Sequence, residues 1–267
     1  MSGPTLRGVE QTVRYDLAGH VATITYDRPE KLNAIDGAMR EQINAAFSRF
    51  RVDDEAWVAV VTGSGRAFCV GADMRSETGS AAGDFPGSFW ERPTVNSFES
   101  GWEINKPVIA AVNGHCLGYG LTLVTWCDFV IASERATFGF PEVTVGIPTI
   151  VGAIRLPQKI NWQYAMELLL TGERIDAARA KEIGLAGWVV PHDTLLDEAR
   201  ALAARLVRAA PLAARATKEM AVRAPGLGAV DAIRFGEAMR RVAAATEDAA
   251  EGAAAFRERR EPVWRGR

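Results

Sequence analysis

The chain has 267 residues, of which 48% are hydrophobic and 24% charged, an ordinary balance for a globular protein. This length allows one large domain or two small ones, with a sizeable buried core in either case. The formal net charge of −2 lacks the basic bias of most nucleic-acid-binding proteins, so we expect no nucleic-acid partner. The N-terminus lacks a basic start followed by an apolar run, and no apolar stretch reaches roughly 18 residues, so we expect neither a signal peptide nor a membrane span.

Three cysteines and three histidines restrict the chemistry from the outset. Cys69, Cys116 and Cys127 are too few and too irregularly spaced for a disulfide framework or a zinc site, so we expect no metal. Their number fits a reducing, cytoplasmic setting. Cys69 and Cys116 are expected to be small core residues.

The first predicted elements are a hairpin and a helix. Apolar and polar residues alternate over 12–27, with a turn at 18–20, which predicts two β-strands. Asp36 has the character of a helix N-cap. Apolar residues follow it at helical spacing and predict one buried helix face: Met39, Ile43, Phe47 and Phe50.

The middle of the chain alternates between buried strands and glycine-rich turns. Residues 57–62 and 107–112 are continuous apolar runs typical of buried strands. The segment 113–120 is rich in glycine, 121–126 continues as a helix, and 128–132 is again a strand. This alternation predicts an α/β fold.

Between these strands, residues 75–94 are rich in glycine, serine and proline. They predict a surface loop, and its aromatic residues either contact a substrate or hold the loop to the body: Phe85, Phe89 and Trp90.

The last third of the sequence is predicted to be helical. One helix ends at Gly172, Asp176 caps the next, and Gly184 ends it. Residues 187–190 form a short strand. From Asp193 onward we expect amphipathic helix, which packs on the body or on a neighbouring subunit because acidic residues are interleaved with its arginines.

Two glycine-containing turns are candidates for binding an anion. Gly71 and Ala72 follow an apolar segment, where glycine permits a sharp turn that exposes an amide N–H. The segment 113–120 opens a helix, whose first N–H groups lack intrahelical partners and lie at the positive end of the helix dipole. Two such N–H groups directed at one point would bind a developing oxyanion. Alone, each turn is equally compatible with phosphate binding or close packing.

In combination, the motifs resemble the enoyl-CoA hydratase/isomerase (crotonase) family in order and spacing, over nearly the whole chain. The C-terminal Phe256, Arg259, Arg260 and Pro262 also resemble the closing segment of that family. The segments that carry the resemblance are 28–34 (RPEKLNA), 67–73 (AFCVGAD), 106–114 (KPVIAAVNG), 127–128 (CD) and 138–148 (FGFPEVTVGIP).

The resemblance implies a crotonase-like α/β spiral of ββα repeats with a helical C-terminal portion. Residues 1–192 would form the core that holds the CoA thioester, and residues 193–267 a helical oligomerisation region. Members usually assemble as trimers or pairs of trimers, so a homotrimer or hexamer is expected. The substrate would be an acyl-CoA, with CoA as part of the substrate and no separate cofactor.

Site residues also follow from the resemblance. The oxyanion donors would be the backbone N–H groups of Ala72 and Tyr119, although the family often has glycine at the second position. The tyrosine ring would then narrow the pocket or supply a phenol. Leu32, Ala72 and Asp73 match positions assigned to CoA binding. Phe256 and Arg259 match positions that contact the nucleotide end of CoA from a neighbouring subunit.

The acid–base residues depart from the family pattern. A hydratase of this family typically uses two glutamates, of which the second matches Glu142 and the first falls on Thr122. A threonine hydroxyl is not a practical general base near neutral pH, although it can position a water. One carboxylate suffices to move a proton from C2 to C4 and shift a double bond, for which burial should raise its pKa. Three other acids are alternatives for the missing base: Glu99, Glu103 and Asp128.

The sequence thus predicts an enzyme that either hydrates 2-enoyl-CoA or isomerises a Δ3 double bond to Δ2, with Glu142 as acid and base. Another thioester reaction on the same scaffold, by a hydrolase, decarboxylase or dehalogenase, is an alternative. No additional nucleophile is evident, which argues mildly against it. A non-catalytic binding module is a third possibility, against which the net charge of −2 argues.

Overall fold

The structure, a computed structural model, describes residues 10–75 and 104–267. The hairpin expected near the N-terminus is confirmed: β1 (Val13–Ala18) pairs antiparallel with β2 (Val21–Tyr26). Gly19 and His20 join the strands with positive φ angles of 54° and 66°. Two left-handed residues match the twist of paired strands, which explains the tight turn.

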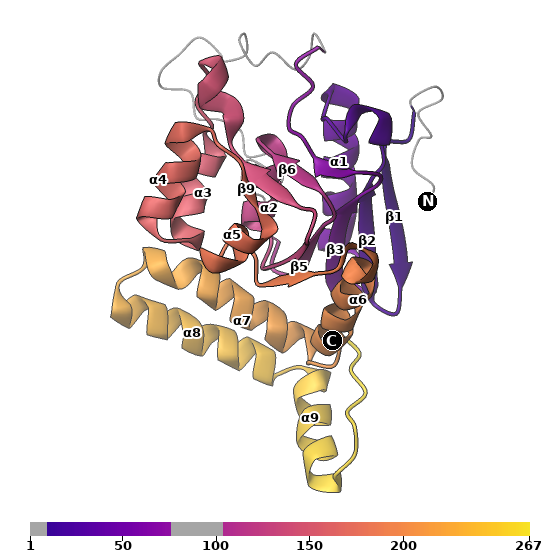
Figure 1. Cartoon of the computed structure of the whole chain (residues 1–267). Coiled ribbons are helices and arrows are strands. Elements are labelled where there is room, and N and C mark those ends of the chain that lie inside the picture. Colours follow the sequence, from indigo (N-terminus) through magenta and orange to yellow (C-terminus); the bar gives the residue numbers. More distant parts are fainter. Residues whose placement is uncertain (1–9, 76–103) are drawn as a thin grey trace.

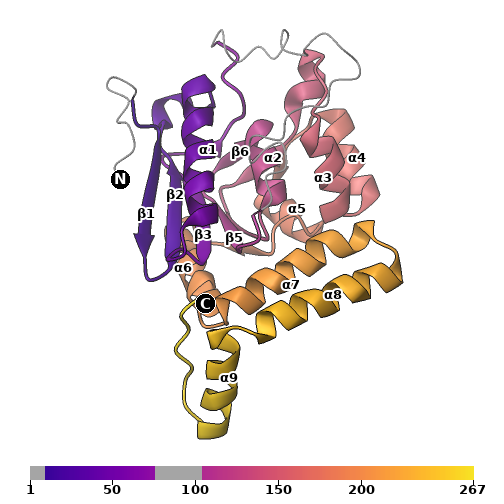
Figure 2. The ribbon, with the colours of Figure 1, turned by 180° about the vertical axis from the view of Figure 1, so that it is seen from behind.

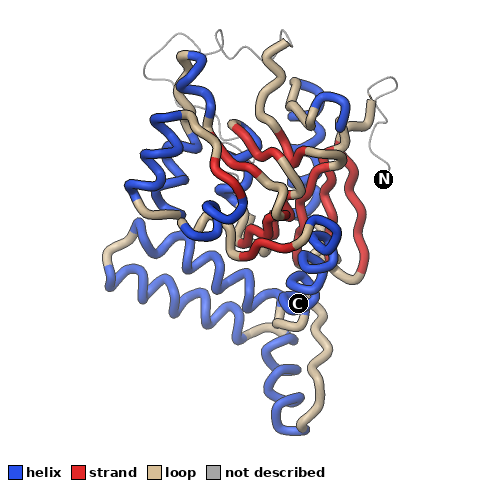
Figure 3. The backbone as a smooth tube through the Cα atoms, in the orientation of Figure 1, coloured by secondary structure: helices blue, strands red, loops and turns tan. Residues whose placement is uncertain are grey.

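Two sheets form the centre of the molecule, with helices around them (Figure 3). The larger sheet has the order β1-β2-β3-β5-β7-β10, and the smaller has the order β4-β6-β8-β9. The remaining strands of the larger sheet are β3 (Val58–Gly63), β5 (Val108–Val112), β7 (Phe129–Ser133) and β10 (Trp188–Val190). The smaller sheet comprises β4 (Ala67–Cys69), β6 (His115–Leu117), β8 (Thr137–Gly139) and β9 (Ile175–Asp176).

The chain passes from one sheet to the other at each turn of the fold. The pairs β3–β4, β5–β6 and β7–β8 each place one strand in the larger sheet and the next in the smaller sheet. Strands related by one turn pair in parallel, as β3 does with β5 and β4 with β6. The expected spiral of ββα repeats is therefore confirmed.

Successive side chains of β3 and β5 point to opposite faces of the sheet, so each strand contributes to two separate apolar layers. Ala59 and Val61 face the main core between the sheets, whereas Val58 and Val60 face the opposite side. The opposite side packs against α6 (Leu195–Val207), through Leu202 and its neighbours. Burial on both faces explains why these strands are continuous apolar runs rather than alternating ones.

Helices cover the rest of the core. α1 (Gly37–Val52) begins at the expected cap, because the N–H of Met39 donates to Asp36 Oδ1 over 2.9 Å. Its apolar face is fully buried, including Phe47 and Phe50. The other core helices are α2 (Tyr119–Trp126), α3 (Val151–Lys159), α4 (Trp162–Thr171) and α5 (Ala177–Glu182), with short 3₁₀ helices η1 (Pro29–Lys31) and η3 (Pro141–Val145).

The C-terminal part is helical, as expected, and is divided into separate helices. After α6 come α7 (Pro211–Arg223), α8 (Ala229–Ala244) and α9 (Glu247–Glu258), followed by a non-helical segment over 261–267. Figures 1 and 2 both show α7 and α8 side by side beneath the sheets and α9 projecting away from the body. The breaks follow local chemistry: Pro211 and Pro225 can begin a helical turn but not continue one, and Thr246 caps α9.

Sequence patterns did not indicate β6, β8 or β9, because two or three residues are too few to show alternation. Most of the expected loop at 75–94, with Phe85, Phe89 and Trp90, lies outside the described residues. Within the described part, no helix is long and apolar enough to cross a membrane.

Cys69, Cys116 and Cys127 are fully or almost fully buried, free thiols, which confirms the core placement expected for the first two. Burial raises the pKa of Cys69 and Cys127 to about 12, and raises that of Cys116 above its ordinary value.

Because the thiolate is the reactive form, we expect negligible reaction of native protein with a disulfide reagent at about pH 8. Absorbance should report three thiols only after denaturation; fast labelling of any thiol in the native protein would contradict this packing.

Candidate active site

The segment around Gly71 holds the amide of Ala72 in a defined orientation. Ile35 N–H donates to Gly71 O over 2.8 Å, and Asp73 N–H donates to Ile35 O over 2.9 Å, which makes Ala72 the partner of Ile35 in a parallel bridge. Successive peptide groups of an extended chain point to opposite sides. The N–H of Ala72 therefore points away from Ile35, toward the other side of the segment.

The start of α2 lies on that other side. Gly71 has a φ of 104°, and a Cβ at this position would lie 3.3 Å from Leu117 O and 3.5 Å from Tyr119 N. A side chain would thus be both strained and crowded, which explains glycine here. The absence of a side chain lets the backbone at Gly71 approach the amide of Tyr119. The use of the Ala72 and Tyr119 N–H groups as oxyanion donors stays a prediction.

Tyr119 is the first residue of α2, and Gly118 precedes it with φ 53° and ψ −123°. The N–H of Gly118 donates to Gly139 O over 2.9 Å, which fixes the helix start to β8. No side chain caps this end of the helix. The positive end of the α2 dipole therefore faces the point where Gly71 approaches, and it favours negative charge there.

Glu142 lies beside the same helix start. It belongs to η3, and a Cβ at Gly118 would lie 3.2 Å from Glu142 Oε1. Burial raises the pKa of this carboxyl above its ordinary value, although its own backbone N–H and Thr149 oppose the shift by hydrogen bonding. Oε2 is buried and has no hydrogen-bond partner among the described residues.

Thr122 is in the first turn of α2 and is only 3% exposed. Its N–H donates to Gly118 O over 3.0 Å, as the helix requires. The structure therefore places Thr122 one turn behind the helix start that Glu142 contacts. Its part in the chemistry stays a prediction.

The Tyr119 ring is buried in the main core, 8% exposed, and the guanidinium of Arg40 lies 5.3 Å from the ring centroid. The ring is thus directed toward α1, from which Arg40 comes. This arrangement leaves the backbone of Tyr119 as the part nearest to Gly71.

Leu32 and Asp73 lie next to the same extended segment. Leu32 has a left-handed φ of 55°, and its carbonyl accepts from Val70 N over 3.3 Å. The Asp73 carboxylate forms an ion pair with Arg28, with 2.9 Å between Oδ2 and Nη1. This hydrogen bond holds the pKa of Asp73 below its ordinary value. The assigned CoA contacts of Leu32 and Asp73 stay predictions. No sequence pattern indicated the contact of Asp73 with Arg28.

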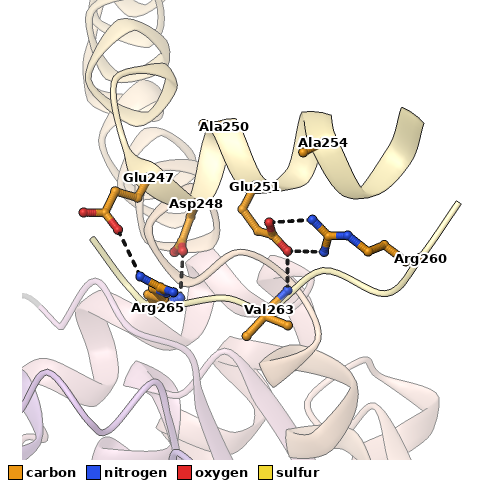
Figure 4. A pocket seen from close by; sticks show the side chains of 8 residues that line it. All are labelled: Glu247, Asp248, Ala250, Glu251, Ala254, Arg260, Val263 and Arg265. Carbon is orange, nitrogen blue, oxygen red and sulfur yellow. Dashed lines mark hydrogen bonds and ion pairs between the residues drawn. The ribbon is translucent and has the colours of Figure 1, made fainter. Parts of the chain in front are cut away.

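The C-terminal residues are separate from Glu142 within one chain. Phe256 is 86% exposed on α9, and Arg259 ends that helix in a left-handed conformation. Arg260 instead forms a two-pronged ion pair with Glu251, with distances of 2.6 and 2.9 Å, beside a hollow of about 530 Å³ (Figure 4). Arg260 follows α9 and is already paired with Glu251 of that helix. Arg259 is for this reason the better candidate for a phosphate contact.

The remaining candidates have structural contacts. Asp128 Oδ2 accepts from Val108 N over 2.8 Å and pairs with Lys218 Nζ over 2.7 Å. His115 Nδ1 forms a hydrogen bond of 2.8 Å with the Thr137 hydroxyl. Glu99 and Glu103 lie outside the described residues.

Comparison with known proteins gives matches over nearly the whole chain. Residues 16–267 match the family model described as enoyl-CoA hydratase/isomerase. A probable enoyl-CoA hydratase from Rhizobium meliloti is 37% identical over 96% of this chain and 99% of its own, and a carnitinyl-CoA dehydratase from Citrobacter koseri is 36% identical over 97% and 100%.

Among solved structures, an enoyl-CoA hydratase/isomerase from Mycobacterium paratuberculosis superimposes with a TM-score of 0.85 at 39% identity, covering 96% of this chain and 99% of that one. A family model that matches nearly the whole chain, together with relatives and a structure of this similarity, is decisive. The chain belongs to the enoyl-CoA hydratase/isomerase family.

Proposed function

We propose that this protein moves a proton next to the thioester of an acyl-CoA, with Glu142 as the acid and base. The observation that carries the proposal is the contact between the Glu142 carboxylate and Gly118 at the uncapped start of α2. A thioester oxygen held by the N–H groups of Ala72 and Tyr119 would place its C2 within reach of that carboxylate. Because the reaction moves only protons, it balances without a separate cofactor.

We favour isomerisation of a 3-enoyl-CoA to a 2-enoyl-CoA. Glu142 would remove a proton from C2, the dienolate charge would develop on the thioester oxygen, and the same carboxyl would return the proton at C4. The two N–H groups would stabilise that charge, and loss of one such donor typically costs about 3 kcal/mol of transition-state stabilisation. Burial suits Glu142 to this exchange, because it raises the pKa of the carboxyl toward neutrality.

Hydration or dehydration is the second candidate, and the names of the relatives support it: a probable enoyl-CoA hydratase and a carnitinyl-CoA dehydratase. Addition of water at C3 needs a group that orients the water. Thr122 stands where the family pattern has its first glutamate, and its hydroxyl would have to hold the water while the Glu142 carboxylate takes a proton from that water and delivers a proton to C2. This mechanism requires a water beside the Thr122 side chain, which is only 3% exposed.

We infer that Phe256 and Arg259 act on a neighbouring copy in a homotrimer or hexamer. Phe256 is on α9 and Arg259 is the C-cap of that helix, which projects away from the body (Figure 1). The exposed ring of Phe256 would pack against an adenine base, and the Arg259 guanidinium would pair with a CoA phosphate.

Replacement of Glu142 by Gln should reduce turnover roughly 10³-fold, because the amide cannot accept the proton. In the wild type, kcat/KM should fall as the pH drops through the raised pKa of Glu142, since the carboxylate is the active base. Paired assays with a 3-enoyl-CoA and crotonyl-CoA identify the reaction. Glu134→Gln, which alters an exposed glutamate, is the matched control. Unchanged activity of Glu142→Gln with both substrates would exclude Glu142 as the proton carrier.

Thr122→Val separates the two reactions. Isomerisation does not use the hydroxyl, so we expect 3-enoyl-CoA turnover to be largely retained. Hydration with a water positioned by Thr122 should instead be lost. Thr125→Val controls for packing, because Thr125 is 1% exposed in the same helix. Selective loss of crotonyl-CoA hydration in Thr122→Val alone would show that the protein is a hydratase.

Gly118→Ala should lower kcat at least about 10²-fold, because the new methyl group displaces the Glu142 carboxylate and small displacements of reacting groups are costly. Gly184→Ala is the control: φ is +81° and no atom lies within 4 Å of its Cβ position, so strain occurs there without a collision. We expect the control to lose about 1 kcal/mol of stability and to keep its activity. Equal activity of both variants would show that the contact between Gly118 and Glu142 is unimportant.

A further inference from the structure

The ion pair between Arg28 and Asp73 lies next to one of the two proposed oxyanion donors. Asp73 directly follows Ala72, whose N–H is one of the two proposed oxyanion donors. Nη1 of Arg28 lies 2.9 Å from Asp73 Oδ2, and the two side chains are only 16% and 15% exposed. An ion pair this sheltered is screened by solvent much less than a surface pair.

The same guanidinium is fixed on its other sides. Its Nη1 also donates to Ala34 O over 2.9 Å, and its Nη2 lies 3.2 Å from Oδ2 of Asp36, the N-cap of α1. The backbone N–H of Arg28 donates to Asn33 Oδ1 over 2.8 Å. Asn33 is fully buried and donates to Ala67 O over 2.8 Å. Arg28 is therefore held rigidly between η1, the start of α1 and β4.

The backbone near Ala72 has few other attachments. Gly71 O and Asp73 N–H bind Ile35, and these two hydrogen bonds form an isolated bridge rather than part of a longer ladder. Gly71 on one side is conformationally permissive. The peptide group that carries the Ala72 N–H is held on one side by the hydrogen bond from Ile35 N–H to Gly71 O, and on its other side it depends on how firmly Asp73 is held. The Asp73 side chain supplies that hold through Arg28.

We propose that Arg28 and Asp73 are positioning residues, and that their ion pair fixes the peptide of Asp73 so that the Ala72 N–H points at the substrate carbonyl. The inference rests on the proposed oxyanion site. It gives Asp73 a role different from direct contact with CoA. The arginine also places a positive charge beside a carboxylate close to the place where negative charge develops. A lysine carries the same charge but lacks the planar fork with which Arg28 reaches Asp73, Ala34 O and Asp36 together.

Asp73→Asn should lower kcat about 10-fold with KM little changed, because a misdirected donor is weakened chiefly in the transition state. Arg28→Lys should give a similar loss, and the double variant should add little, as expected for residues that act as one unit. Asp128→Asn is the matched control. Asp128 pairs with Lys218 and accepts from Val108 N–H, just as Asp73 pairs with Arg28 and accepts from Arg75 N–H over 3.1 Å. It should match the loss of thermal stability in Asp73→Asn but keep kcat.

A second readout is independent of turnover. Infrared difference spectra of bound butyryl-CoA, labelled with ¹³C at the thioester carbonyl, report the strength of the hydrogen bonds to that oxygen. The carbonyl stretch should shift to lower frequency in the wild type and in Asp128→Asn, and shift less in Asp73→Asn and Arg28→Lys. Because this saturated ester has no double bond to move, the test does not depend on whether the enzyme is an isomerase or a hydratase.

The possible outcomes distinguish the positioning role of Arg28 and Asp73 from the oxyanion site itself. A full carbonyl shift in both Asp73→Asn and Arg28→Lys, with unchanged kcat, would overturn the positioning role while leaving the oxyanion site intact. A raised KM with unchanged kcat in Asp73→Asn would instead indicate that Asp73 contacts CoA, and would also overturn it. Absence of any shift in the wild type would overturn the oxyanion site itself, and the positioning role with it.

Discussion

The close approach of Gly71 to the start of α2 is the constraint on which the site depends. Two segments almost fifty residues apart meet so closely that a Cβ on Gly71 would lie 3.5 Å from Tyr119 N, and one on Gly118 would lie 3.2 Å from the Glu142 carboxylate. The spiral makes this possible, because β4 and β6 are adjacent parallel strands of the smaller sheet. Their carboxyl ends therefore reach the same edge, where Gly71 and Gly118 follow.

The electrostatics of α2 match this arrangement. At its C-terminal end, Lys159 Nζ donates to Cys127 O over 2.6 Å and Arg155 Nη2 to Thr125 O over 3.4 Å, so cations satisfy the negative end of the helix. At its N-terminal end no side chain serves as a cap. Cations thus compensate the negative C-terminal end of the buried helix α2, and no side chain caps its positive N-terminal end. The helix therefore produces a fixed positive potential at its N-terminus. Such a potential is useful to a reaction whose charge develops on a single oxygen.

The sequence was informative where local chemistry decides the outcome. Asp36 and Asp176 cap α1 and α5 as expected, and continuous apolar runs marked β3 and β5, because these signals lie within a few residues. The two glycine turns were candidates on local grounds, and the resemblance to a family then joined them into one site and added Glu142. Neither pattern nor resemblance indicated the ion pair of Arg28 with Asp73, since it joins residues 45 positions apart and exists only once the chain has folded. The same is true of the inward direction of the Tyr119 ring, which packing against α1 decides.

Two carboxylates near the helix start differ because their surroundings push their pKa values in opposite directions. Asp73 is paired with Arg28 and stays ionised, so it serves as a fixed charge that cannot exchange a proton in the neutral range. Glu142 lacks a cationic partner among the described residues, and burial raises its pKa, so it can take up and release a proton. Divergent pKa values in one site are the physical basis for assigning different roles to chemically similar groups. On this ground the proposed mechanism assigns the proton transfer to Glu142 and the positioning of the oxyanion donor to Asp73. In that mechanism the threonine at 122 leaves the carboxylate to act without a second base from α2.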